Sequence, residues 1–344
     1  MDVQVPDRWD IGQINADRVK AVAAFGLTDR QARFLVTVML HSGVFVGRQY
    51  CTFAGITHGQ KVHDFVEKLL AKRLATATTL GSQQRARVFH VHHKPLYAAI
   101  GEPDNRNRKP VAIGRAIERL MLLDGVLADS TITWLGAERD KRRHFIRRLG
   151  DSLEMHEYPR LVFGTAPKTT VRYFADKLPI GFEPDRRRHV FLYLPTSPVP
   201  MDYRLFLLRH ADLFHAVGHW TIRVLFPGPV KSAIARFEAA AYDQLANPLR
   251  ISEVEELGWL FRQRKSAASS PPDHDPARLA AASRAFRGPR FQALHRRWLE
   301  VGDRALWMAQ SPVFRDALER GDACVECVAL PHVYMHLSSL VGTS

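Results

Sequence analysis

Apolar residues recur at helical spacing in three short stretches between residues 28 and 71. The third stretch is the most regular, because five apolar residues fall on one helix face: Val62, Phe65, Val66, Leu69 and Leu70. This spacing predicts an amphipathic helix with that face buried. Between the first and third stretches, Gly43 and Gly47 interrupt the pattern. They predict a short middle helix from about Arg48 to Ala54, ended by Gly55.

Two polar pairs mark helix starts. Thr28 is followed three residues later by Gln31, and Thr57 is followed three residues later by Gln60. In this spacing each side chain can accept from the other residue's backbone N–H, which forms a capping box. We therefore expect helices to begin just after Thr28 and Thr57.

The next segment, ATATTLGSQQRARVFHVHH, has β-branched and aromatic residues on both sides of a polar turn at Gly81 to Gln84. It predicts two strands joined by that turn. Three helices followed by a hairpin is the order of a winged helix, so we expect a winged helix-turn-helix within residues 1–100. In this fold the last helix enters the DNA major groove, and its first residues reach base edges.

The predicted contacts with duplex DNA follow from this geometry. On the third helix and just before it, the candidates are His58, Gln60, Lys61, His63 and Lys68. Beside the hairpin turn, Arg85 and Arg87 would hold phosphates or enter the minor groove. Farther along, Arg142 and Arg143 share one face of a basic amphipathic stretch, residues 138–149, which either extends the phosphate-binding surface or is a solvated face.

Charge favours the same interpretation. The 344-residue chain has 49 Lys and Arg against 35 Asp and Glu, a net charge of +14. Residues 1–150 hold 24 basic and 14 acidic residues, a net +10, whereas residues 151–344 hold 25 and 21, a net +4. Most of the surplus therefore accompanies the predicted winged helix, where positive charge would displace counterions from phosphates.

After a polar, proline-bounded segment at 101–110, strand and helix patterns alternate from about residue 130. This alternation predicts an α/β domain with a mixed or parallel sheet. The small-residue and proline run SAASSPPDHDP at 266–276 predicts a flexible linker. The expected organisation is α+β: a winged helix at 1–100, a linker and connecting helix at 101–129, an α/β domain at 130–246 and a helical region at 247–344.

Three segments carry a resemblance to a known family. They are LTDRQARFLVTVM at 27–39, ATATTLGSQQRARVFHV at 75–91, and IGFEPDRRRHVFLYL at 180–194 with its Pro184–Asp185 pair. Over about residues 25–245 the chain resembles the replication-relaxation family of plasmids and integrative elements. The resemblance implies a DNA-binding factor of a mobile genetic element, acting in replication, transfer or transcription regulation.

The α/β segment also invites comparison with the restriction-endonuclease-like fold, which uses several carboxylates to bind a catalytic metal. Asp185 would be the first ligand. The strand after it, HVFLYL, has neither a carboxylate nor a lysine. We therefore expect at most a degenerate nuclease domain without activity, and a turn at Pro184–Asp185. A metal-dependent nuclease remains an alternative function.

A second metal hypothesis concerns the C-terminal end of the chain. Cys324, Cys327, His332 and His336 have the spacing C-x2-C-x4-H-x3-H, and thiolate with imidazole suits zinc. The surrounding CVECVALPHVYMHL is apolar and lacks the glycines of a short zinc knuckle. A buried strand or helix with incidental cysteines is the preferred interpretation, so no metal and no cofactor are expected.

Composition limits the remaining possibilities. Three cysteines are too few for a disulfide framework, and the acidic start is not a signal segment, so the chain is expected to be cytoplasmic. No apolar stretch is long enough to span a bilayer, and no membrane role is expected. We expect a DNA-binding protein rather than an enzyme. A homodimer or a protein partner is a further expectation, and a winged helix that serves only as a protein-interaction adaptor is the other alternative.

Overall fold

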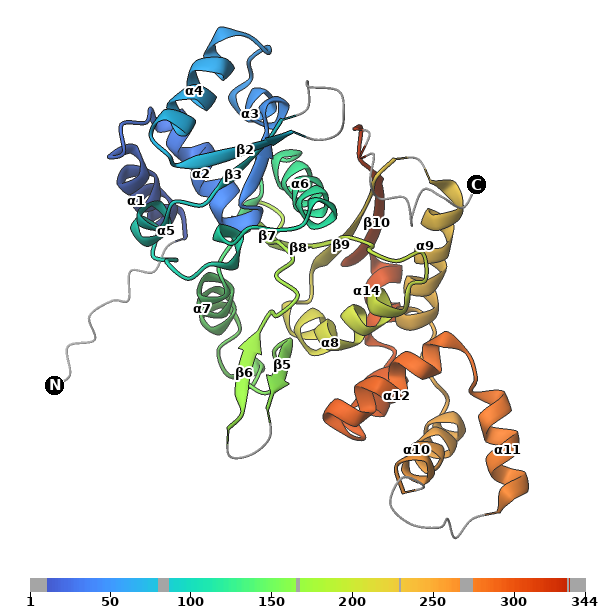
Figure 1. Cartoon of the computed structure of the whole chain (residues 1–344). Coiled ribbons are helices and arrows are strands. Elements are labelled where there is room, and N and C mark those ends of the chain that lie inside the picture. The colour runs from blue at the N-terminus through green and yellow to red at the C-terminus, as the bar shows by residue number, and fades with distance from the viewer. Residues whose placement is uncertain are drawn as a thin grey trace, which may run out of the picture. The chain divides into compact units, whose positions relative to one another are not determined.

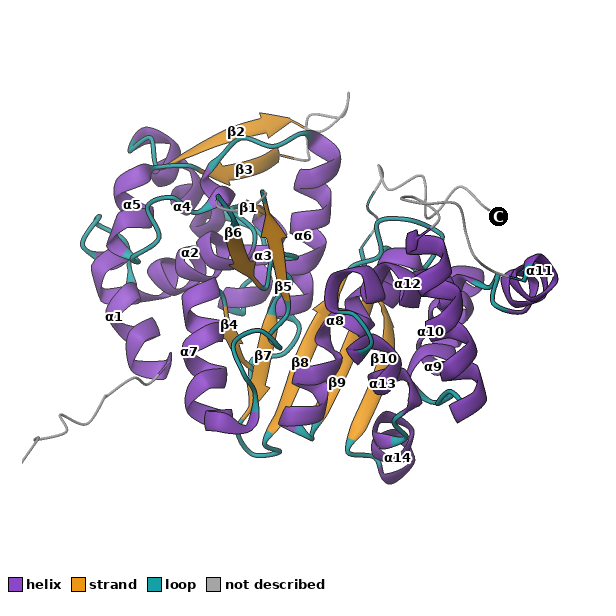
Figure 2. Ribbon diagram, turned by 90° about the horizontal axis from the view of Figure 1, so that it is seen from below, coloured by secondary structure: helices purple, strands orange, loops and turns teal. Residues whose placement is uncertain are grey.

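The structure, a computed structural model, describes residues 11–79, 87–164, 168–228, 230–266, 275–332 and 334. It mixes helices with several sheets (Figures 1 and 2). The chain divides into two compact units, each formed from separate parts of the sequence. Unit 1 comprises Met1–Phe145, Lys177–Leu194 and Leu330–Ser338, and unit 2 comprises Ile146–Asp176, Pro195–Ala329 and Ser339–Ser344. The domain boundaries expected from the sequence stay a prediction.

Unit 1 begins with helices and short strands in close succession. Its first elements are α1 (Ile11–Ala23), α2 (Asp29–His41), β1 (Val44–Val46), α3 (Gly47–Ala54), α4 (Gln60–Ala71), β2 (Ala75–Thr79), β3 (Arg87–Val91) and α5 (Lys94–Ala99). The three strands form an antiparallel sheet in the order β1-β3-β2. The three helices and the two strands of the hairpin were predicted, but β1 was not.

Local chemistry explains these boundaries. The capping box at Thr28 is confirmed, because the Gln31 amide N–H donates to Thr28 Oγ1 at 3.4 Å and the Thr28 N–H donates to Gln31 Oε1 at 3.1 Å. Gly43 has a φ of 75°, and a Cβ there would collide with the backbone oxygen of Asn107. A glycine is therefore required in the turn that leads from α2 into β1.

The rest of unit 1 contains a connecting helix and three further paired strands. Its elements are the 3-10 turn Arg106–Arg108, α6 (Ile113–Leu127), β4 (Thr133–Leu135), α7 (Glu138–Leu149, which continues into unit 2), β7 (Ile180–Glu183) and β8 (Arg188–Tyr193). β4, β7 and β8 pair antiparallel. The bounds predicted for α7 are confirmed, whereas β7 was missed.

A buried ion pair and a buried histidine lie near α7. Arg18 on α1 donates to both carboxylate oxygens of Asp140, at 2.8 and 3.1 Å, and both side chains are almost fully buried. His41, at the end of α2, has its ring 6.5 Å from that of Trp134. Burial, with the positive charges of Lys141 and Arg18, lowers the pKa of His41 from 6.5 to about 3. His41 is thus neutral in the folded chain at neutral pH.

Unit 2 contains a two-stranded ribbon, a parallel strand pair and several helices. Its elements are the 3-10 turn Gly150–Ser152, β5 (Arg160–Phe163), β6 (Thr170–Tyr173), α8 (Met201–Val217), β9 (Trp220–Phe226), α9 (Lys231–Leu245), α10 (Ile251–Ser266), α11 (Pro276–Ala285), α12 (Pro289–Val301), α13 (Arg304–Gln310), α14 (Val313–Arg320) and β10 (Ala323–Ala329). β9 and β10 pair in parallel. Ser266 and Pro276 belong to helices, and most of the predicted linker between them lies outside the described residues.

Two clusters form the main cores. In unit 1, α2, α3, α4, β3 and α5 enclose a cluster that includes Phe34, Phe45, Phe65 and Tyr97. In unit 2, α10 and α12 enclose a cluster around Phe261, Leu294 and Trp298. Each unit therefore has an apolar interior of its own, as independently folding bodies require.

Substitution of Phe34 tests how much the unit 1 core contributes to stability. The side chain is fully buried, and its ring lies 5.1 to 6.1 Å from those of Phe45, Tyr50, Phe53 and Phe65. Phe34→Ala should lower the free energy of unfolding by about 3–5 kcal/mol, because it leaves a cavity among these rings. Urea denaturation measures this, with the exposed Tyr242→Ala as control. A loss below about 1 kcal/mol would contradict the packing.

His41 predicts a pH dependence of stability. Since its pKa is lower in the folded chain than in the unfolded one, the unfolded chain takes up a proton between about pH 6.5 and 3, and stability falls as pH falls through that range. From pH 7 to 5, His41→Leu should lose about 2 kcal/mol less of its unfolding free energy than the wild type. His63→Leu, at an exposed position, is the matched control, and equal losses in all three proteins would refute the assignment.

Candidate nucleic-acid interface

An aromatic cluster fixes the orientation of α4. Phe65 of α4 lies with its ring 4.3 Å from that of Tyr50 on α3, 6.0 Å from Phe45 on β1 and 6.1 Å from Phe34 on α2. The predicted apolar face is confirmed: Val62, Phe65, Val66 and Leu69 are buried, and Leu70 is half-buried. With this face held by rings from three other elements, the opposite face of α4 must point to solvent.

The solvent face of α4 and the residues just before it carry the predicted contacts. His58, Gln60, Lys61 and His63 are exposed, and Lys68 is half-buried. Gln60 Nε2 donates to Asp64 Oδ1 at 2.6 Å. The structure therefore brings the five residues together along one side of the helix and its approach.

The start of α4 differs from the prediction in a way that affects its electrostatics. The capping box expected at Thr57 and Gln60 is wrong: the N-cap is Gly59, no side chain caps the helix, and its first turn contains no acidic residue. The exposed N–H groups of a helix N-terminus carry partial positive charge. This end of α4 thus presents Lys61 and unshielded backbone donors to solvent.

The β2–β3 hairpin adds one described cation near α4. Arg87, the first residue of β3, is exposed, with its guanidinium 5.4 Å from the centre of the Phe89 ring and 3.9 Å from Glu67 of α4. Both members of this ion pair are about half exposed, so the pair is weak. Arg85 and the predicted turn at Gly81 to Gln84 lie outside the described residues.

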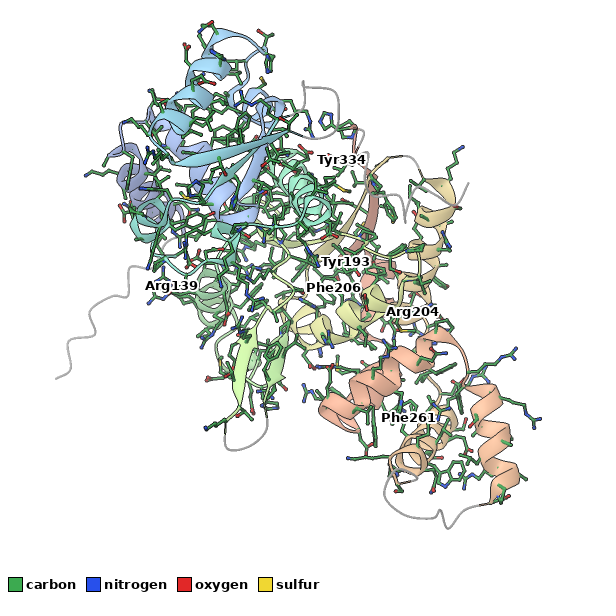
Figure 3. All side chains as sticks on the ribbon, in the orientation of Figure 1. Arg139, Tyr193, Arg204, Phe206, Phe261 and Tyr334 are labelled. Atoms are coloured by element: carbon green, nitrogen blue, oxygen red, sulfur yellow. The ribbon has the colours of Figure 1, made fainter. Side chains whose placement is uncertain are left out.

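A network of hydrogen bonds around Asp124 of α6 holds α3 in place. The sequence did not predict this network. Arg48 donates to both oxygens of the carboxylate at 2.7 Å, and Gln49 Nε2 donates to Oδ1 at 2.9 Å. The hydroxyl of Tyr334, which Figure 3 labels, donates to the same carboxylate. The Arg48 guanidinium lies 5.9 Å from the centre of the Tyr334 ring. Burial beside this negative charge raises the pKa of Tyr334. Arg48 and Tyr334 are 76 and 210 residues away from Asp124 in the sequence, so no local sequence pattern could indicate these contacts.

Arg142 and Arg143 are not brought close to α4. Both lie on α7, where Arg142 is half-buried and Arg143 is exposed. Figure 1 shows α7 at the far end of unit 1 from α4. These arginines therefore belong to a separate basic surface, and their contribution to DNA binding stays a prediction.

The metal hypotheses find no support in the described part of the chain. Cys324 and Cys327 lie on β10, three residues apart and thus on opposite faces of the strand. Burial, with the nearby Glu238 carboxylate, raises the pKa of Cys327 to about 12, so this thiol is protonated at neutral pH. His332 follows the strand, and His336 lies outside the described residues. The expected strand is confirmed as β10, although most of its residues are half-buried rather than buried. That its cysteines are incidental stays a prediction.

Asp185 occupies a turn, as the sequence predicted. Residues 184–187 form the exposed turn between β7 and β8, in which Arg187 has a φ of 51°. Among the residues that the structure describes, no group of three or more His, Cys, Asp and Glu side chains is placed to hold a metal ion. Asp185 therefore has no described partners with which to form a nuclease site.

Comparison of the chain with protein-family models, with curated proteins and with solved structures gave no match. Within the described ranges, no helix is both long and apolar enough to cross a bilayer.

The Asp124 network predicts how firmly α3 is held. Asp124→Asn keeps the shape of the side chain but removes the charge that Arg48 and Gln49 bind, so the unfolding free energy should fall by about 2 kcal/mol. Asp29→Asn is the matched control, because Asp29 pairs with Arg33 at 2.7 Å on an exposed surface and should contribute little. Equal effects of the two substitutions in urea denaturation would show that the network is not a structural anchor.

Proposed function

We propose that residues 27–91 fold as a winged helix and that the protein binds duplex DNA through α4 and the β2–β3 hairpin. The support is the element order α2-β1-α3-α4-β2-β3 together with the sheet order β1-β3-β2. In this interpretation α3 and α4 are the helix-turn-helix pair, joined at residues 55–59, and β2 and β3 flank the wing. α4 is then the helix that enters the major groove.

The observation that carries the proposal is the two-sided character of α4. One face is fixed in the aromatic cluster, while the other presents Gln60, Lys61 and His63 beside an uncapped, acid-free N-terminus. Residues in the first turn of a recognition helix are those that reach base edges. The Gln60 amide, released from Asp64, can make the paired donor and acceptor contacts that adenine offers in the major groove.

Phosphate contacts would supply most of the affinity. Lys61 at the start of α4 and Arg87 at the start of β3 are exposed cations on adjacent elements. When DNA approaches, the Arg87 guanidinium exchanges its weak pairing with Glu67 for a phosphate, with which a guanidinium forms paired, charge-assisted hydrogen bonds. The net +10 of residues 1–150 attracts the polyanion from a distance.

Salt dependence tests this proposal. Each phosphate contact lowers log K by about 0.9 per unit of log salt concentration. The double variant Lys61→Ala/Arg87→Ala should bind a mixed-sequence duplex more weakly and reduce the salt slope by about 1.8. Fluorescence anisotropy of the full chain between about 50 and 200 mM salt measures both quantities.

The matched control is Lys231→Ala/Arg236→Ala, which removes two exposed cations from α9 of unit 2. It should leave the slope close to that of the wild type. A wild-type protein that binds no duplex at low salt would contradict DNA binding and favour the adaptor alternative. A double variant with an unchanged slope would remove Lys61 and Arg87 from the interface.

A further inference from the structure

The ribbon formed by β5 and β6 in unit 2 lies outside the proposed interface and exposes apolar side chains. It is a sheet of only two strands, in which Arg160 pairs with Tyr173, Leu161 with Arg172, Val162 with Val171 and Phe163 with Thr170. An isolated two-stranded hairpin is marginally stable in water. The ribbon therefore needs further contacts at its base to stay folded, and these contacts anchor it.

The anchor is a pair of buried aromatic residues. Tyr158 and Phe174 flank the two strands, each is only 2% exposed, and their rings meet edge to face at 6.3 Å. The Phe174 N–H donates to the Pro159 carbonyl at 2.7 Å, which closes the base. Beyond this base the described residues 162–164 and 168–172 are exposed, so they can meet a partner.

Apolar side chains are exposed on both faces of the outer part. Val162 and Val171, opposite each other in the register, are 55% and 38% exposed. On the other face Phe163 is 48% exposed, with the Arg172 guanidinium 5.9 Å from its ring centre. A partner that docks on a single face would cover only one of these sets. A groove that receives the ribbon covers both.

Charge indicates the chemistry of that groove. The sequence from Tyr158 to Ala175 contains Arg160, Lys168 and Arg172 and no acidic residue. Two paired strands lie about 4.8 Å apart, and the major groove of B-DNA, about 12 Å wide, admits a two-stranded ribbon. In a second copy of this chain the same three cations would face their equivalents and repel them. A polyanionic groove fits, and a symmetric ribbon-to-ribbon contact does not.

We propose that the β5–β6 ribbon is a second DNA contact that enters a groove of the duplex. Lys168 and Arg172 bind phosphates on its walls, while Phe163 and Val162 contact apolar base and sugar surfaces inside. This inference rests on the proposed DNA-binding function. It adds a contact from unit 2 that is independent of α4.

Two ribbon variants of the full chain separate the charge from the apolar contacts. Lys168→Ala/Arg172→Ala should reduce the salt slope of duplex binding by about 1.8, because two phosphate contacts are lost. Phe163→Ala should weaken binding about fivefold, which corresponds to about 1 kcal/mol, with the slope unchanged. All three positions are exposed, and circular dichroism with urea denaturation confirms that each variant folds.

The controls are Lys231→Ala/Arg236→Ala for charge and Tyr242→Ala for apolar surface, all on α9, and both should bind as the wild type does. If the wild type binds no duplex, the proposed function and the ribbon contact fail together. If the wild type binds and Lys61→Ala/Arg87→Ala lowers the slope while both ribbon variants match the wild type, only the ribbon contact is overturned. Ribbon variants that shift a dimer to monomer in sedimentation velocity without changing DNA binding would also overturn it, by assigning the ribbon to contacts between copies.

Discussion

The burial of Phe65 is the constraint on which the rest of the interface depends. Its ring contacts aromatic residues from α2, β1 and α3, and Phe89 of β3 joins the cluster through Phe45 at 5.2 Å. Rotation of α4 about its axis would expose Phe65 and Val62 and bury charged residues, at a cost of several kcal/mol. The cluster thus determines which residues of α4 meet solvent, although none of its rings is expected to touch DNA.

Ion pairs divide the charged residues of unit 1 into two groups. Arg18 and Arg48 form bidentate ion pairs with Asp140, which is buried, and with Asp124, which is partly buried. Removing one partner of such a pair leaves an uncompensated charge, so these arginines serve the fold. Among the described contacts, neither Lys61 nor Arg87 forms a comparable ion pair. Arg87 lies 3.9 Å from the exposed Glu67 carboxylate and 5.4 Å from the centre of the Phe89 ring. The net charge alone did not reveal this division, which requires the tertiary contacts.

The sequence predicted the elements with strong local signals and missed those whose signals are tertiary. The helical period at Val62 to Leu69 and the box at Thr28 and Gln31 located α4 and α2 correctly. β1 has three residues, too few for a recognisable period, and exists because β3 pairs with it. The box at Thr57 failed because Gly59 caps α4 instead. The exposed candidates on α4 followed from its periodicity, whereas the Asp124 network and the ribbon's exposed apolar faces required the folded chain.

The central claim is that the outward face of α4 lies against DNA, and photocrosslinking tests it most directly. A benzophenone amino acid would replace Gln60 on α4 in one variant of the chain. In a second variant it would replace Arg262, which is 56% exposed on α10. With a labelled duplex, the account predicts a DNA adduct from position 60 and none from position 262. Full DNA binding by both proteins, with no adduct from position 60, would contradict it.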